Sequence, residues 1–116
     1  KYPNDVRLWT EDLYTGDLSS AGYQLRPHIV WFGEDVPMLN TAVGEMRDAD
    51  IAIIIGTSLQ VYPAASLISF VPDNCNVYYV DPKPHMSWEL KQRKNLEVIE
   101  KSAGIGVVKL VYEILS

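Results

Sequence analysis

The hydrophobic residues of the chain occur at two spacings, one typical of β-strands and the other typical of α-helices. Apolar, β-branched or aromatic runs predict strands at residues 28–32, 51–56, 76–81 and 95–100. The run at 51–56, IAIIIG, is apolar at positions that point to both faces of a strand. This is the pattern of a central parallel strand covered by helices on each side, so we expect it to lie within a sheet.

Helical spacing appears between these runs. Asp35 and Pro37 mark a helix start, and the apolar positions that follow lie on one face: Leu39, Ala42, Val43 and Met46. Pro63 stands where a second helix begins, and Pro72 ends it. A terminal helix, opened by SAGIG at 102–106, carries an apolar stripe of Val107, Val108, Val111, Ile114 and Leu115. The alternation of strand and helix predicts an α/β fold, with an open, mostly parallel sheet and helices on both faces.

Residues 1–24 differ from the rest of the chain because they show little periodicity and contain many turn-forming residues. We expect a loop there, with one short helix around Asp5 to Leu13.

Size and composition predict one small domain, since the chain has 116 residues and a hydrophobic content of 47%. Ten basic and fifteen acidic side chains give a formal net charge of −5. The longest basic cluster is KQRK at 91–94, which we interpret as a solvated turn. Because phosphate backbones and anionic surfaces need a concentrated positive patch, neither nucleic acid nor a membrane is an expected partner.

The single cysteine, Cys75, lies in the turn-like sequence PDNCN, and we interpret it as a bystander rather than a nucleophile. One cysteine can form neither an internal disulfide nor a C-x-x-C pair for zinc. No apolar run approaches the ~20 residues that cross a bilayer. These features favour a cytoplasmic protein, and the start at KYPND without a methionine leads us to expect a piece of a longer chain.

Small residues follow the central strand in the sequence GTS. The carboxyl ends of parallel strands lie at one edge of a sheet, so we expect GTS and the DPK sequence at 81–83 to face the same crevice. Gly56 and Asp81 are 25 residues apart (81 − 56), close to the spacing at which a dinucleotide fold places an acid against ribose hydroxyls. Thr57 and Ser58 carry hydroxyl and N–H groups for the same ligand. Two plainer interpretations stay open, with GTS as an ordinary turn and Asp81 as a helix cap.

Three longer motifs narrow the interpretation: LRPHIVWFGEDVP at 25–37, DADIAIIIGTSLQVYPAASL at 48–67 and VYYVDPKP at 77–84. Together they resemble the carboxyl-terminal half of a sirtuin, a NAD-dependent protein-lysine deacylase. The resemblance implies about half of a Rossmann-like catalytic domain. It divides the chain into residues 1–24, an irregular remnant at the position of the family's zinc module, and residues 25–116, the carboxyl-terminal part of the NAD-binding domain.

The resemblance implies which turns contact NAD. The GTS turn contributes Gly56, Thr57 and Ser58. The turn after the next strand usually reads Asn-x-Glu in the family and binds the adenosine ribose, and here it reads Asp81-Pro82-Lys83. Asp81 can accept a hydrogen bond from a ribose hydroxyl, whereas Lys83 has no acceptor. Near the terminal helix, KSAG resembles the adenine site and points to Ala103, with a helix start that merely needs small residues as the alternative.

The VWFGE motif resembles the strand and loop that hold an acylated lysine. An extended substrate peptide would pair its backbone between this loop and the segment after GTSL. The substrate positions carried over are Val30, Phe32, Gly33, Glu34 and Val61. An apolar acyl-lysine stem suits a hydrophobic channel, and we interpret Glu34 as a structural hydrogen-bond acceptor rather than an acid catalyst. From the residues alone, Trp31 and Phe32 would be core residues.

No catalytic residue is assigned, because the family's general-base histidine lies in an H-G motif that this sequence lacks. Neither His28 nor His85 matches its position. We therefore expect an amino-terminal half of the same protein as a partner, and no deacylase activity from these 116 residues alone. A nucleotide-binding module without turnover is the alternative, which Lys83 favours slightly, and a purely structural domain is the third possibility.

No zinc is expected either. The family's C-x-x-C aligns with LSSA at 18–21, which has no thiolate. Hydrophobic packing is expected to hold this segment in place of a metal, through Trp9, Leu13 and Tyr14.

Overall fold

The structure of the protein is a computed structural model, and it describes residues 6–116. The chain forms two compact units, Lys1–Asp35 and Val36–Ser116, so the expectation of one small domain from its length is wrong. The division expected between residues 24 and 25 follows the family resemblance and stays a prediction.

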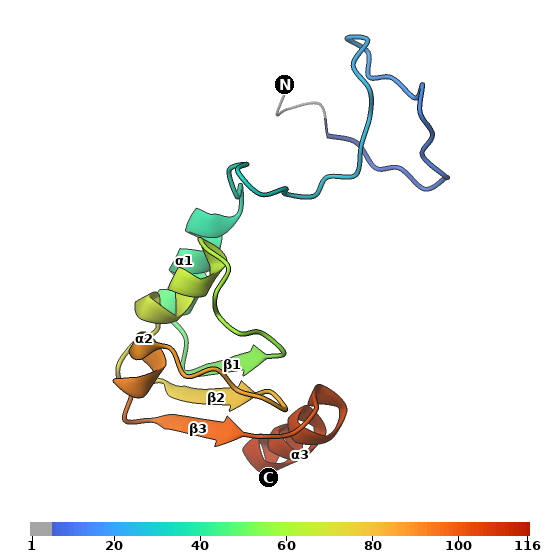
Figure 1. Ribbon diagram of the computed structural model, residues 1–116. Helices are drawn as coiled ribbons and strands as arrows, with labels where there is room; N and C mark the ends of the chain where they lie inside the picture. The colour runs from blue at the N-terminus through green and yellow to red at the C-terminus, as the bar shows by residue number, and fades with distance from the viewer. Residues whose placement is uncertain (1–5) are drawn as a thin grey trace. The chain divides into compact units, whose positions relative to one another are not determined.

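The unit Val36–Ser116 is built on a sheet of three parallel strands in the order β1-β2-β3. The strands are β1 (Ile51–Ile55), β2 (Asn76–Val80) and β3 (Leu96–Ile99). Around them lie α1 (Leu39–Arg47), the 3₁₀ helix η1 (Ala64–Phe70), α2 (Trp88–Lys91) and α3 (Ala103–Leu115). Figure 1 shows the three strands pointing in the same direction. The predicted α/β fold with an open parallel sheet is confirmed.

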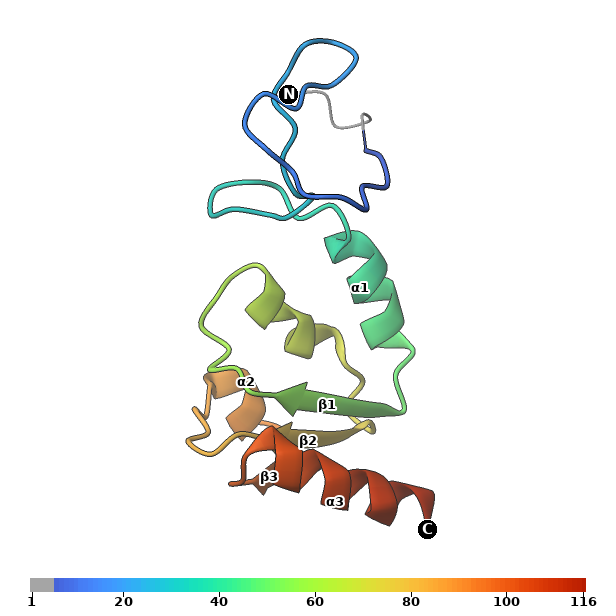
Figure 2. The same cartoon turned by 90° about the vertical axis from the view of Figure 1, so that its right-hand side faces the viewer.

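Helices lie on both faces of this sheet, and successive side chains of the central strand β2 point to opposite sides. The expectation that the run at 51–56 is a central strand covered on both faces is wrong, because within the described residues β1 is an edge strand whose alternate isoleucines are exposed. Val77 and Tyr79 are buried on one face, in a core cluster with residues of η1 and α2. Val80 is buried on the other face, against Gly106 of α3. Figure 2 accordingly shows α1 and η1 on one side of the strands and α3 on the other.

The apolar stripe predicted for the terminal helix is partly wrong. Val107 and Ile114 are half-buried as expected, but three members of the stripe are exposed: Val108, Val111 and Leu115. Gly106 and Leu110 are the buried residues of α3. The helix is apolar around most of its circumference, so the spacing of apolar residues does not single out one face, and a glycine contributes nothing to such a pattern.

Two helices differ from the prediction. The second predicted helix is present as the 3₁₀ helix η1. The sequence pattern missed α2 because only Leu90 of its residues is buried. Its start was marked by Ser87, whose hydroxyl accepts a hydrogen bond from the N–H of Leu90 at 3.4 Å. No helix in the described part of the chain is long and apolar enough to cross a membrane.

The interpretation of KQRK as a solvated turn is wrong for Arg93. Its guanidinium donates hydrogen bonds to the carbonyls of Ile68 at 2.8 Å, Val71 at 2.6 Å and Pro72 at 3.0 Å. These carbonyls lie at the end of η1, where a helix leaves acceptors without partners. Arg93 therefore ties the loop after α2 to the end of η1.

Cys75 is part of the core cluster and is 2% exposed. Burial raises the pKa of its thiol, and the nearby Arg93 acts in the opposite direction. Because the thiolate is the reactive form, we expect a thiol reagent to leave Cys75 unlabelled in the folded protein and to label it after denaturation. Mass spectrometry of the peptide that contains Cys75 measures this, and rapid labelling of the native protein would contradict it.

In the unit Lys1–Asp35, the described residues are irregular apart from an antiparallel bridge between Leu18 and Gln24. The side-chain amide of Gln24 donates hydrogen bonds to three carbonyls, those of Tyr14, Asp17 and Leu25. Trp9 is 41% exposed and Tyr14 is 66% exposed. The expectation of hydrophobic packing is therefore wrong for the two aromatic residues, while its third member, Leu13, is half-buried. Polar bonds around Gln24 organise the segment.

Two predicted elements of this unit are also wrong. Residues 6–13 contain no helix, and a short helix without a packed face is marginal in water. Asp5, where that helix was expected to begin, lies outside the described residues. Residues 28–32 form a loop, because within residues 6–35 no strand lies alongside to complete a ladder. Their backbone bonds locally instead, as when the N–H of Ile29 donates to the carbonyl of Pro27 at 2.8 Å.

Candidate functional site

Three turns from separate parts of the sequence begin at the same edge of the sheet. The strands are parallel and end in register, with Ile55 beside Val80 and Val80 beside Ile99 (Figure 1). The segments that follow them are the GTS turn, the DPK turn and the start of α3. The fold thus places all seven residues predicted for NAD at this edge: Gly56, Thr57, Ser58, Asp81, Pro82, Lys83 and Ala103. Their part in binding stays a prediction.

The GTS turn has a backbone conformation that depends on a small residue. Gly56 has a φ of +60° and donates its N–H to the carbonyl of Val80 at 3.0 Å. The hydroxyl oxygen of Thr57 accepts a hydrogen bond from the N–H of Leu59 at 3.2 Å. Leu59 itself has a φ of 53°, a left-handed conformation that a leucine rarely adopts. Ser58 is exposed, and within residues 6–116 its hydroxyl and its N–H have no hydrogen-bond partner.

The DPK turn uses one carboxylate oxygen of Asp81 and leaves the other open. Oδ1 accepts a hydrogen bond from the N–H of Lys83 at 2.7 Å, and the N–H of Asp81 donates to the carbonyl of Ile99 at 3.2 Å. Oδ2 has no partner in the described part of the chain and can accept from a hydroxyl group. Asp81 closes a turn and caps no helix, because the next helix has Ser87 at its N-cap. Lys83 is exposed.

The start of α3 presents open backbone donors. The N-cap residue, Ser102, makes no side-chain cap, and its carbonyl accepts from the N–H groups of Ile105 and Gly106. The preceding N–H groups, of Ala103 and Gly104, have no intrahelical acceptor. A Cβ at Gly104 would meet nothing within 4 Å. This helix end can therefore receive an oxygen-rich or aromatic group without steric obstruction.

The VWFGE loop lies in the other unit and is closed by an ion pair. Nη2 of Arg26 donates to both carboxylate oxygens of Glu34 at 2.9 Å. Nη1 of Arg26 donates to the carbonyl of Ile29 at 2.9 Å. Glu34 also accepts from the N–H of Trp31 at 3.2 Å. Glu34 is therefore a hydrogen-bond acceptor within this loop, as interpreted from the sequence, and its part in substrate binding stays a prediction. Arg26 is part of the quoted motif, but no pattern in the sequence indicates this role for it.

The apolar residues of this loop are exposed. Phe32 is 92% exposed, Trp31 61% and Val30 46%, so the core interpretation of the two aromatic residues is wrong. Gly33 has a φ of +84°, a left-handed backbone conformation that favours glycine, and it lies in the turn just before Glu34. Val61, the remaining predicted substrate residue, is 57% exposed and belongs to the unit Val36–Ser116. Substrate binding by these residues stays a prediction.

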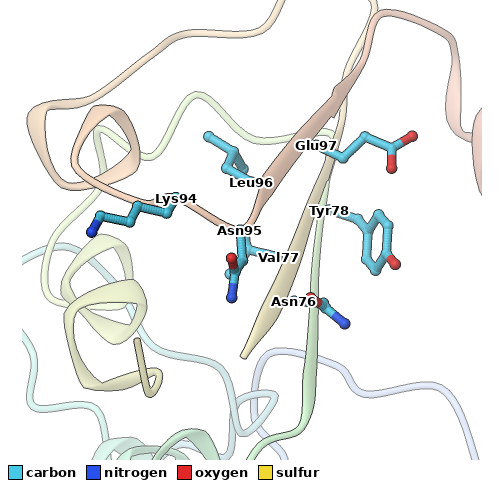
Figure 3. A pocket seen from close by; sticks show the side chains of 7 residues that line it. All are labelled: Asn76, Val77, Tyr78, Lys94, Asn95, Leu96 and Glu97. Carbon is cyan, nitrogen blue, oxygen red and sulfur yellow. The ribbon is translucent and has the colours of Figure 1, made fainter. Parts of the chain in front are cut away.

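A shallow hollow of about 180 Å³ lies at the opposite edge of the sheet, at the start of β2 and β3. It is lined by Asn76, Val77, Tyr78, Lys94, Asn95, Leu96 and Glu97. Figure 3 shows these side chains pointing in different directions, with Lys94 on one side and Tyr78 and Glu97 on the other. The hollow is therefore separate from the candidate site and gathers no set of converging polar groups.

Metal ligands do not gather in the part of the chain that the structure covers, where no group of three or more His, Cys, Asp or Glu side chains could hold an ion. His28 is exposed, and His85 contributes its backbone N–H to the hydroxyl of Tyr79 at 3.0 Å. The absence of zinc stays a prediction.

Comparisons with known proteins agree with the motifs. The model of the Sir2 family matches residues 5–63. An NAD-dependent protein deacylase of Helicobacter pylori is 50% identical over 103 residues, which are 89% of this chain and 44% of the relative. A mutant Sir2 homologue in complex with ADP-ribose superposes with a TM-score of 0.71 at 30% identity, covering 99% of this chain and 42% of that one. A Sir2 protein bound to a myristoylated histone peptide gives a TM-score of 0.65 at 29% identity, covering 82% and 40%.

The chain belongs to the Sir2 family, since the family model matches half of its length. It spans less than half the length of the curated relatives that it matches.

Proposed function

We propose that this chain is the carboxyl-terminal part of an NAD-dependent protein-lysine deacylase. Residues 36–116 contribute to NAD binding, and the loop at 26–34 contributes to binding of the acyl-lysine peptide. The observation that carries the proposal is the meeting of the GTS turn, the DPK turn and the start of α3 at one edge of a parallel sheet. Such an edge is where open α/β sheets bind their ligands.

The polar groups at this edge fit the chemistry of NAD. Bound NAD would supply the nicotinamide ribose as the electrophile for the acyl oxygen, with nicotinamide as the leaving group. Ser58 offers a hydroxyl and an N–H, and Asp81 offers a free carboxylate oxygen to a ribose hydroxyl. The exposed Ala103 leaves space for the adenine. Lys83 cannot accept a hydrogen bond, so this ribose contact of the family has no counterpart at its position.

The exposed loop at 26–34 fits an acyl-lysine peptide. Its apolar residues, Val30 and Phe32, can bury against an acyl chain, while the ion pair between Arg26 and Glu34 closes the loop at its base. The Sir2 structure with a myristoylated histone peptide supports an acylated peptide as the substrate class. The general base and the rest of the NAD site are assigned to an amino-terminal half of the same protein, consistent with the relatives being more than twice as long.

The role of the GTS turn can be tested with Ser58→Ala in the complete protein. Because the exposed Ser58 hydroxyl has no partner within residues 6–116, its loss is expected to weaken NAD binding by about 1 kcal/mol, roughly fivefold, without changing stability. Calorimetric titration of NAD and denaturant unfolding measure the two quantities. Ser69→Ala is the matched control, because Ser69 is an exposed serine of η1 away from the three turns.

Nicotinamide release with NAD and an acetyl-lysine peptide tests the proposed reaction in the same protein. NAD binding without nicotinamide release would favour the alternative of a non-catalytic nucleotide-binding module, which Lys83 supports. Equal NAD affinity of wild-type protein and Ser58→Ala would remove the Ser58 hydroxyl from the site, whereas the backbone N–H of residue 58 is kept in this variant.

A further inference from the structure

Tyr79 joins two of the three turns from inside the core. Its side chain is 0% exposed and belongs to the core cluster beneath η1 and α2. The hydroxyl donates a hydrogen bond to the carbonyl of Thr57 at 2.7 Å and accepts one from the N–H of His85 at 3.0 Å. Thr57 lies in the GTS turn, and His85 closes the segment that begins with the DPK turn. One buried hydroxyl thus links the GTS turn to the segment just after the DPK turn, through main-chain groups of both.

Both hydrogen bonds of Tyr79 are made to backbone groups, so they fix the path of the chain rather than the rotamer of a side chain. A tyrosine hydroxyl has one proton to donate and lone pairs that accept. Here the proton goes to the carbonyl of Thr57 and a lone pair receives the N–H of His85. No buried side-chain polar atom is left unpaired in the described part of the chain. The link is therefore fully satisfied, and its removal would leave two backbone groups without their partner.

The bond to Thr57 also sets the direction of a donor. The peptide between Thr57 and Ser58 is trans, and a trans peptide holds its C=O and its N–H antiparallel. Since the carbonyl of Thr57 points to Tyr79 in the core, the N–H of Ser58 points away from the core. That N–H has no hydrogen-bond partner within residues 6–116. Tyr79 thereby presents a free amide donor at the edge of the sheet.

We propose that Tyr79 is a positioning residue for the nucleotide, which aims the Ser58 N–H outward and holds the GTS and DPK turns at a fixed separation. This role rests on the proposed NAD site. Preorganised donors bind a ligand more tightly because less conformational freedom is lost on binding. Leu59, just after the turn, has a left-handed conformation that costs free energy and persists only where surrounding contacts hold the backbone.

The test compares Tyr79→Phe with Tyr78→Phe in the complete protein. Tyr78 is the half-buried neighbour whose hydroxyl has no partner among the residues described. Tyr79→Phe is expected to raise the NAD dissociation constant five- to tenfold and to leave the KM of an acetyl-lysine peptide and the kcat at saturating NAD within twofold. Tyr78→Phe is expected to leave all three within twofold. A Tyr79→Phe protein that is folded and binds NAD like wild type would overturn the proposal, and so would equal losses for NAD and peptide.

Hydrogen exchange in the absence of NAD tests the link independently of the proposed function. The amide of His85 is expected to exchange at least tenfold faster in Tyr79→Phe than in Tyr78→Phe, at a temperature well below the unfolding transition. Unchanged exchange at His85 would overturn the proposal even if NAD affinity falls. Failure of the wild-type protein to bind NAD would overturn the proposed function, and with it the role of Tyr79 in binding. The exchange result would still show whether the Tyr79 hydroxyl holds the amide of His85.

Discussion

Replacing Phe32 with alanine is expected to raise the KM of an acyl-lysine peptide by about 10- to 150-fold in the complete protein. Phe32 is 92% exposed in the structure, so its ring is free to become buried against an acyl chain. Burying a phenylalanine side chain contributes about 1.5–3 kcal/mol, and each 1.4 kcal/mol corresponds to a factor of ten. Steady-state kinetics with an acetyl-lysine peptide at saturating NAD measure the change.

The NAD dissociation constant of Phe32→Ala is expected to stay within twofold of wild type, because the residues proposed to bind NAD lie in the unit Val36–Ser116 and Phe32 does not. Tyr112→Ala is the matched control, since Tyr112 is an aromatic residue of α3 that is 73% exposed. An unchanged peptide KM in Phe32→Ala would remove the residue from the acyl-lysine channel. A KM that rises equally in Tyr112→Ala would point to a general effect of losing surface aromatic residues.

Replacing Gly106 with alanine is expected to lower the free energy of unfolding by about 2–3 kcal/mol. A Cβ at Gly106 would lie 2.6 Å from Cγ1 of Val80 and 3.2 Å from Cγ2 of Ile99. Val80 is 1% exposed and β-branched, so its side chain has little freedom to move aside. Forcing an extra carbon into a packed core costs about 1–3 kcal/mol, and here the alternative is to lift α3 from the sheet. Denaturant unfolding of the complete protein measures the loss.

Gly104→Ala provides the control for this substitution. It gives α3 the same gain in helix propensity, up to about 1 kcal/mol, but its Cβ would meet nothing within 4 Å. The difference between the two variants therefore isolates the steric effect. Adding Val80→Ala to Gly106→Ala removes the closest atom, so the double variant is expected to lose less stability than the sum of the single ones. Equal stability of Gly104→Ala and Gly106→Ala would show that α3 adjusts without cost.

The sequence was sufficient to predict the strands where an apolar run pairs within a sheet. The run at 76–81 contains β2, whose side chains are buried on both faces, and the run at 51–56 contains β1, an edge strand with only one face packed. The run at 28–32 has the same composition but forms a loop. Strand propensity describes how well a residue fits a packed sheet, and no strand within residues 6–35 runs beside it to form one.

The turns of the candidate site could be predicted from the sequence, but the residues that hold the surrounding chain in place could not. GTS and DPK stand directly after apolar runs, so their place at one edge follows from parallel topology alone. Tyr79 reads as an ordinary core residue of a strand, and its two hydrogen bonds depend on how turns distant in sequence fold over it. Arg93 likewise stands in a basic surface-like cluster, although its partners lie more than twenty residues earlier.

The order β1-β2-β3 has a consequence for folding. Each strand pairs with the next one along the chain, so the pairing of Ile51 with Asn76 closes 25 residues (76 − 51) and that of Val77 with Leu96 closes 19 (96 − 77). Parallel pairing is intrinsically slow because a crossover must close first, and these separations keep the entropic cost of each closure low. β1, η1 and β2 can assemble as the chain leaves the ribosome, before β3 and α3 are made. α3 can dock onto Val80 once β2 and β3 have paired, and the missing side chain of Gly106 allows this close approach.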